Sequence, residues 1–90
     1  MVEVKRVVLD ILKPHHPNAL EFSGQIAELG ADYRVKLTVL EMDEKTQTLK
    51  VVVEAASVDF DGIQEVINRL GASLHSIDEV EVVNVADTPT

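Results

Sequence analysis

The sequence predicts one small α+β domain in which a strand–helix–strand unit occurs twice, and three observations support this. Four segments are rich in valine, leucine and isoleucine and partly alternate apolar with polar residues, which is typical of strands. Two segments carry apolar residues three and four positions apart, as amphipathic helices do. Glycine, proline or aspartate lies at the boundaries. A chain of 90 residues makes one domain with a thin core.

The first unit opens with a strand over Val2–Lys13, because alternate residues are apolar and a proline follows. Pro14–Pro17 is a rigid loop that holds two histidines. A helix then begins at Pro17 or Asn18 and ends near Leu29, just before a glycine. Its apolar residues follow helical spacing, so one face packs on a sheet.

Two further strands follow in close succession. Alternation predicts them over Tyr33–Glu44 and Leu49–Ala55, with a polar turn over Met42–Gln47 between them. The short separation favours an antiparallel hairpin.

The second unit ends with a helix and a strand. Asp59 is a good N-cap for a helix over Phe60–Leu70, and a glycine follows as its stop. The last strand covers Ala72–Val83. Its apolar parity shifts between Leu74 and Ile77, which indicates a bulge or a bend.

This element order, βαββαβ, predicts a ferredoxin-like sandwich in which an antiparallel four-stranded sheet of order 4132 carries both helices on one face. The domain spans residues 1–90, and 84–90 is expected to be a flexible polar tail. The other sheet face is open and mixed, so it meets another subunit or pairs charges across strands. Its residues are Arg6, Val8, Asp10, Lys36, Thr38, Lys50, Val52 and Glu54.

The composition argues against several classes of binding partner. The formal net charge is −8 and only three residues are aromatic, which argues against nucleic acid and anionic membranes. Surplus carboxylates would attract a cation or a basic partner, or serve only solubility. Without cysteine the chain has no disulfide and no thiol catalysis, which suits a cytoplasmic protein. No apolar run approaches the ~20 residues of a membrane span.

Two polar segments are candidate sites. The loop holds His15 and His16; histidine is a common metal ligand, but a solvated turn explains the pair equally. The segment Ser73–Glu81 is the densest polar cluster, and its strand lies beside the first, near Asp10. Carboxylates there suit Ca²⁺ or Mg²⁺, and an added imidazole favours a transition metal. The alternative is an edge strand kept charged against aggregation.

Within that segment, His75, Glu79 and Glu81 share strand parity if no bulge intervenes. Enzyme signatures are absent: the sequence has no glycine-rich phosphate loop, no His-Glu-x-x-His and no Gly-x-Ser-x-Gly. The run Asp59-x-Asp61-Gly62 lacks the later ligands of a calcium loop, so these carboxylates are assigned to the helix dipole.

Three stretches together resemble DUF211, a family of small archaeal proteins of unknown function. They are Val7–His15, Val58–Asp61 and Ser73–Val80. The resemblance implies a ferredoxin-like fold, a cytosolic setting and ring-like homo-oligomers, with no established activity. The family often has an acidic residue after the first loop histidine, where this chain has His16. The candidate metal ligands are chosen where these motifs coincide with the polar cluster. They are Asp10, His15, His75, Asp78 and Glu79.

Three hypotheses follow. The first is a non-enzymatic module that forms a homo-oligomeric ring and binds a divalent cation, Ca²⁺ or Mg²⁺ before Zn²⁺, or a small ligand at subunit interfaces. The second is a regulatory small-molecule sensor, which rests on fold analogy. The third is a small hydrolase or isomerase using His75 with Asp78 or Glu79 as a general base.

Overall fold

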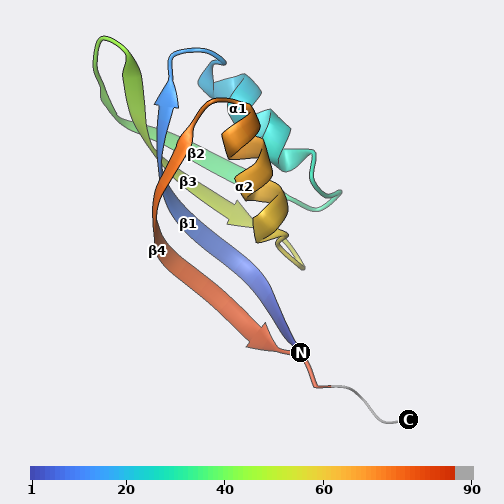
Figure 1. Ribbon diagram of the computed structural model, residues 1–90. Helices are drawn as coiled ribbons and strands as arrows, with labels where there is room; N and C mark the ends of the chain where they lie inside the picture. Colours follow the sequence, from blue (N-terminus) through green and yellow to red (C-terminus); the bar gives the residue numbers. More distant parts are fainter. Residues whose placement is uncertain (87–90) are drawn as a thin grey trace.

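The computed structural model describes residues 1–86 and has the predicted βαββαβ order (Figure 1). The strands pair antiparallel throughout in the order β2-β3-β1-β4, which is the predicted 4132 arrangement. The elements are β1 (Val2–Pro14), α1 (Ala19–Ala27), β2 (Arg34–Met42), β3 (Thr46–Glu54), α2 (Phe60–Arg69) and β4 (Ser73–Asn84).

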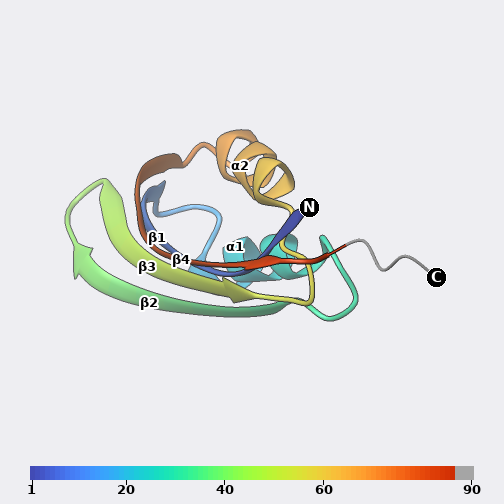
Figure 2. The ribbon, with the colours of Figure 1, turned by 90° about the horizontal axis from the view of Figure 1, so that it is seen from below.

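Both helices lie on one face of the sheet, as Figure 2 shows. The side chain of Asn18 caps α1 by accepting from the amide of Glu21 at 2.8 Å. Asp59 caps α2 as predicted, by accepting from the amide of Gly62 at 3.0 Å. The first helix ends at Ala27, earlier than expected.

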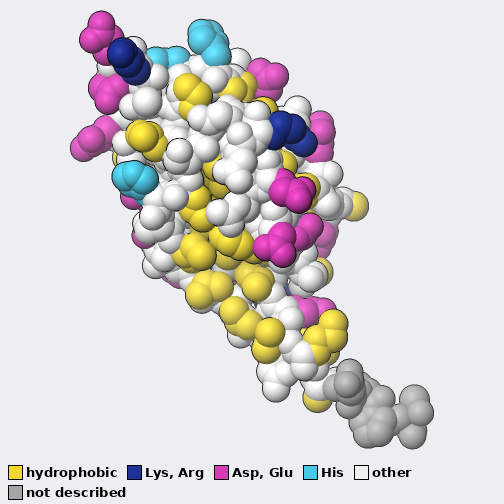
Figure 3. All heavy atoms as spheres, in the orientation of Figure 1, with side chains coloured by type: hydrophobic (Ala, Val, Ile, Leu, Met, Phe, Trp, Pro, Cys, Tyr) yellow, Lys and Arg dark blue, Asp and Glu magenta, His cyan; other side chains and the backbone are white. Residues whose placement is uncertain are grey.

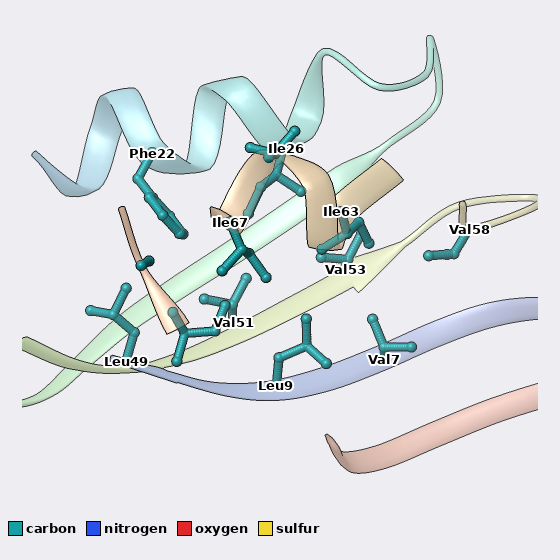
Figure 4. Packing of buried hydrophobic residues seen from close by; sticks show 13 residues of the cluster. Val7, Leu9, Phe22, Ile26, Leu49, Val51, Val53, Val58, Ile63 and Ile67 are labelled. Atoms are coloured by element: carbon teal, nitrogen blue, oxygen red, sulfur yellow. The ribbon is translucent and has the colours of Figure 1, made fainter. Parts of the chain in front are cut away.

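The core lies between the helices and the inner sheet face and is aliphatic apart from Phe22 (Figure 4). From β1 it takes Val7, Leu9 and Ile11, which alternate with open-face residues as predicted. Val8 and Val52 point to the open face, yet their exposed fractions are only 6% and 8%. The middle of the open face is therefore covered by the longer side chains around these valines.

The two ladders of β1 differ in regularity. Its pairing with β3 runs without interruption from Arg6 opposite Glu54 to Pro14 opposite Thr46. Its pairing with β4 shifts register three times, which confirms the predicted irregularity in the last strand. The unpaired residues at these shifts are Lys5 on β1, and His75 and Asp78 on β4.

Beyond the helices, β1 and β4 continue as a two-stranded arm that lengthens the molecule to 57 Å (Figure 1). Hydrophobic side chains extend onto this arm in Figure 3. The predicted tail begins later than expected, because Asn84 pairs with Val2 inside β4. The amide of Val85 also donates to the carbonyl of Met1 at 2.7 Å. The remaining tail, 87–90, lies outside the described residues.

One charged side chain is fully buried at the end of β1. Lys13 follows Ile11 on the core side, and its Nζ donates to the carbonyls of Pro14 at 2.8 Å and Pro17 at 2.5 Å. Desolvation lowers its pKa. These bonds fasten the histidine loop to the end of β1. Within residues 1–86, no helix combines the length and apolar character that crossing a bilayer requires.

Candidate functional site

Four of the five candidate ligands lie along the β1–β4 ladder. Asp10 pairs with Ser76 of β4 on one side and with Lys50 of β3 on the other. The hydroxyl of Ser76 donates to Asp78 at 2.6 Å. Asp10 Oδ1 is buried and has no hydrogen-bond partner among residues 1–86, which is a costly state for a carboxylate oxygen. An unpartnered carboxylate oxygen at this position favours a cation or a hydrogen-bond donor.

The register shifts change which sheet face each candidate ligand on β4 points to. His75 and Asp78 are the extra residues at the two shifts on β4, so neither has a direct partner on β1. The shift at Asp78 separates His75 from Glu79, and the shared parity expected without a bulge is lost. Glu79 and Glu81 lie opposite Val8 and Arg6, so these two carboxylates share the open face.

Glu79 already has a cationic partner. Arg6 Nε donates to a Glu79 carboxylate oxygen at 2.5 Å, and a second guanidinium nitrogen lies 3.3 Å from Glu54. The hydrogen bond to Glu79 raises the pKa of Arg6, and nearby Glu54 adds to the effect. Within one chain, this ion pair makes Glu79 a poor metal ligand.

His15 does not join the other candidates. Its Nε2 donates to the carbonyl of Asp43 at 2.8 Å, which ties the histidine loop to the β2–β3 turn. Across residues 1–86, no group of three or more histidine and carboxylate side chains is arranged to hold a metal. The five candidates therefore do not form a metal site within a single chain.

On the open face, the two outer strands instead carry opposite charges. Read across the sheet from β4 to β2, two rows of paired residues begin with an acidic residue and end with a basic one. One row reads Glu81, Arg6, Glu54, Arg34, and the next reads Glu79, Val8, Val52, Lys36. We call Glu79 and Glu81 the acidic edge, and Arg34 and Lys36 the basic edge.

Both outer strands also expose apolar side chains. On β2 these are Val39, Leu40 and Met42, and on β4 they are Ile77, Val80, Val82 and Val83. By pairing, Ile77 and Val80 share the face of Leu9 and Val7, which carries the helices. Each edge thus presents one charged side and one apolar side along unpaired backbone, a surface that favours strand addition.

A hollow of about 350 Å³ lies on the open face beside the basic edge. It is bounded by Arg6, Arg34, Lys36 and Lys50, with Val52 between the strands and Glu54 as the acidic member. These residues were expected on the open face, with Arg34 alternating beside them, but their grouping by sign was missed. The predicted order places these strands side by side, but the grouping also depends on the register between them.

Comparison with known proteins decides the family. The sequence pattern of DUF211, described as uncharacterized ArCR, matches residues 5–87. The chain belongs to the DUF211 family. A DUF211-like relative is the uncharacterized protein MJ0319 of Methanocaldococcus jannaschii, which is 46% identical over 77 residues. That alignment covers 86% of this chain and 79% of the relative. The resemblance expected from the three sequence stretches is confirmed, and with it an archaeal relative.

Proposed function

We propose that this DUF211 chain is a non-enzymatic, cytoplasmic module that assembles from identical copies, joined by the basic edge of one copy and the acidic edge of the next. The observation that carries the proposal is the opposite charge of the two outer strands on the open face. The rows end in Arg34 and Lys36 on β2 and begin with Glu81 and Glu79 on β4. A second copy that continues the rows therefore brings opposite charges together.

Strand direction supports the same contact. Because all three ladders are antiparallel, β2 and β4 run in opposite directions. Repeating the sheet order places β4 of one copy antiparallel to β2 of the next. If the two edge strands pair without a register offset, Arg34 lies opposite Glu81 of a second copy. Lys36 then lies opposite Glu79, because the two strands run in opposite directions. On the helix side, Val35 then faces Val80 of that copy, and apolar surface is buried.

Such a contact joins two different surfaces, so it propagates until the rotation between copies closes a ring. Closure pairs the backbone of both free edge strands where they lie opposite each other, and it covers the apolar side chains between them, such as Val80. A 90-residue chain with a thin core gains stability from this burial.

A cation site at this edge needs ligands beyond those of one chain. Asp10, His75 and Asp78 lie near the β4 edge, and the single chain described over residues 1–86 has no three-ligand group. We propose that any Ca²⁺ or Mg²⁺ site lies at the boundary, where side chains of a second copy complete it. Melting curves with Ca²⁺, Mg²⁺, Mn²⁺ and Zn²⁺ test this, and the absence of stabilisation by every metal contradicts the cation proposal.

The molecular mass of the protein in solution tests whether the chain assembles. Light scattering and native mass spectrometry at micromolar concentration should give a multiple of the 9.9 kDa chain mass. Raising the salt concentration should lower that mass, because the pairs between edges are exposed and screened. A monomer at every concentration and salt level contradicts the proposal.

A further inference from the structure

We propose that the hollow on the open face binds a small polyanion that carries phosphate groups, held by Arg6, Arg34, Lys36 and Lys50. This ligand class is the opposite of the cation that an acidic chain suggests. It follows from where the few basic residues lie rather than from the net charge.

The distribution of cations is the first support. The chain has eight lysines and arginines against sixteen acidic residues, yet four of the eight bound this one hollow. Elsewhere, Lys13 is used to fasten the histidine loop, and Lys5 pairs with Glu3. Half of the basic residues are therefore gathered on one sheet face, where mutual repulsion opposes their grouping.

Pairing is the second support. Within residues 1–86, Arg6 is the member of this group that forms ion pairs, whereas Arg34, Lys36 and Lys50 form none. All three are exposed and border the hollow. A site with unneutralised cations on several sides of one cavity favours a ligand with more than one negative charge.

The shape suits phosphate groups. Neighbouring strands lie about 4.8 Å apart, and same-face residues of one strand lie about 6.5–7 Å apart, so adjacent phosphates can reach different cations. The hollow's 350 Å³ falls in the range of small-ligand sites, about 300–1,000 Å³. Val52, exposed by only 8%, gives an apolar floor that strengthens the charge attraction above it. Thr38 adds a hydroxyl donor at the rim.

Glu54 sets the limit on affinity. It pairs with Arg6 at 3.3 Å and lies opposite both Arg6 and Arg34. Its carboxylate thus orients one arginine but also repels a bound anion. Replacing it with glutamine keeps the size of the side chain and removes this charge, so Glu54→Gln should tighten binding.

The site also has a consequence for assembly, which rests on the proposed function. Arg34 and Lys36 are the cations that edge pairing places opposite Glu81 and Glu79 of a second copy. A polyanion in the hollow and a neighbouring copy therefore compete for the same charges. Ligand binding should lower the assembled mass, so that the module responds to a phosphate-bearing metabolite.

The test uses inorganic pyrophosphate, titrated into the full chain by calorimetry and two-dimensional NMR at low ionic strength. Lys36→Gln with Lys50→Gln should weaken binding by about tenfold or more, and Glu54→Gln should tighten it several-fold. The matched control is Lys45→Gln, in the β2–β3 turn outside the hollow. It should leave the affinity within about twofold, since screening limits the effect of a distant charge.

Equal weakening by Lys45→Gln and by the double variant Lys36→Gln, Lys50→Gln, or NMR shifts away from β2 and β3, would overturn the site. The two proposals fail separately. If the chain is monomeric yet binds pyrophosphate in a manner that depends on Lys36 and Lys50, the assembly is wrong and the anion site stands. If the chain assembles, and pyrophosphate has no effect on NMR or calorimetry even in the Glu79→Lys, Glu81→Lys variant, whose basic edge has no acidic partner, the anion site is wrong and the assembly stands.

Discussion

The two outer strands of the sheet are alike in one respect and opposite in another. Both expose apolar side chains, such as Val39 on β2 and Val80 on β4. Toward the open face, however, β2 carries Arg34 and Lys36, while β4 carries Glu79 and Glu81. Edges guarded only against aggregation would be protected equally well by charges of one sign, which would repel other copies. Opposite signs instead fit the proposed contact between the two edges.

The largest effect should come from reversing one edge. Arg34→Glu with Lys36→Glu makes both edges acidic, so copies repel and the assembly should dissociate to monomers by light scattering. Lys45→Glu with Arg69→Glu changes the net charge equally but lies outside both edges. This control should keep the assembled mass. Dissociation of both variants would mean that net charge, and not edge complementarity, governs assembly.

Edge cations and the buried cation should differ sharply in their effect on folding. Lys13→Met removes the donor that satisfies the carbonyls of Pro14 and Pro17. It should lower the free energy of unfolding by about 2–4 kcal/mol, whereas exposed Lys36→Gln should change it by at most about 0.5 kcal/mol. Lys13→Met should be measured by urea unfolding in the Arg34→Glu, Lys36→Glu variant. Because that variant is expected to be monomeric, its unfolding reports folding without assembly. Equal stability of Lys13→Met and its parent would contradict the account of the loop.

The apolar side of the contact should contribute less than its charges. Val80 is 54% exposed, so Val80→Ser should leave the folded chain intact and weaken assembly by about fivefold. Leu20 is exposed on α1, outside both edge strands, and Leu20→Ser is the matched control. Dissociation constants from dilution series measure both. An unchanged constant for Val80→Ser would restrict the contact to the charged side.

The smallest effect concerns the turn that joins β2 to β3. Asp43 accepts from the amides of Thr46 at 2.8 Å and Lys45 at 2.9 Å, and these bonds lower its pKa. A lowered pKa in the folded chain adds stability above the ordinary value, 3.8, and this addition is lost as pH falls through the lowered value. Asp43→Asn should therefore flatten the acid end of the melting-temperature profile. An unchanged profile would contradict this role.

Much of the fold could be predicted because its signals are local. Asp59 acts as the predicted cap, the alternation in β1 places Val7, Leu9 and Ile11 in the core, and the parity shift before Ile77 marks real register changes. The first helix ends at Ala27 because its last turn tightens: the amide of Leu29 donates to Ile26 at 3.1 Å. Sequence spacing alone does not separate that turn from the helix.

The candidate site was harder to predict because it depends on pairing between distant segments. His15 looked like a ligand beside Asp10, but its bond to Asp43 depends on how the β2–β3 turn packs. Strand alternation places Lys13 on the core side, after Ile11. Its hydrogen-bond partners, the carbonyls of Pro14 and Pro17, depend on the path of the loop and do not follow from that alternation. The grouping of charges on the open face depends on both the strand order and the register, and only the strand order could be predicted from the sequence.

Mixing two reversed variants tests edge recognition most directly. One carries Arg34→Glu and Lys36→Glu, and the other carries Glu79→Lys and Glu81→Lys. Each has two edges of one sign and should be monomeric alone. Mixed in equal amounts, they present opposite edges to each other and should form assemblies that contain both chains in a 1:1 ratio by native mass spectrometry. If both remain folded by circular dichroism and the mixture stays monomeric, pairing between β2 and β4 is not how this chain assembles.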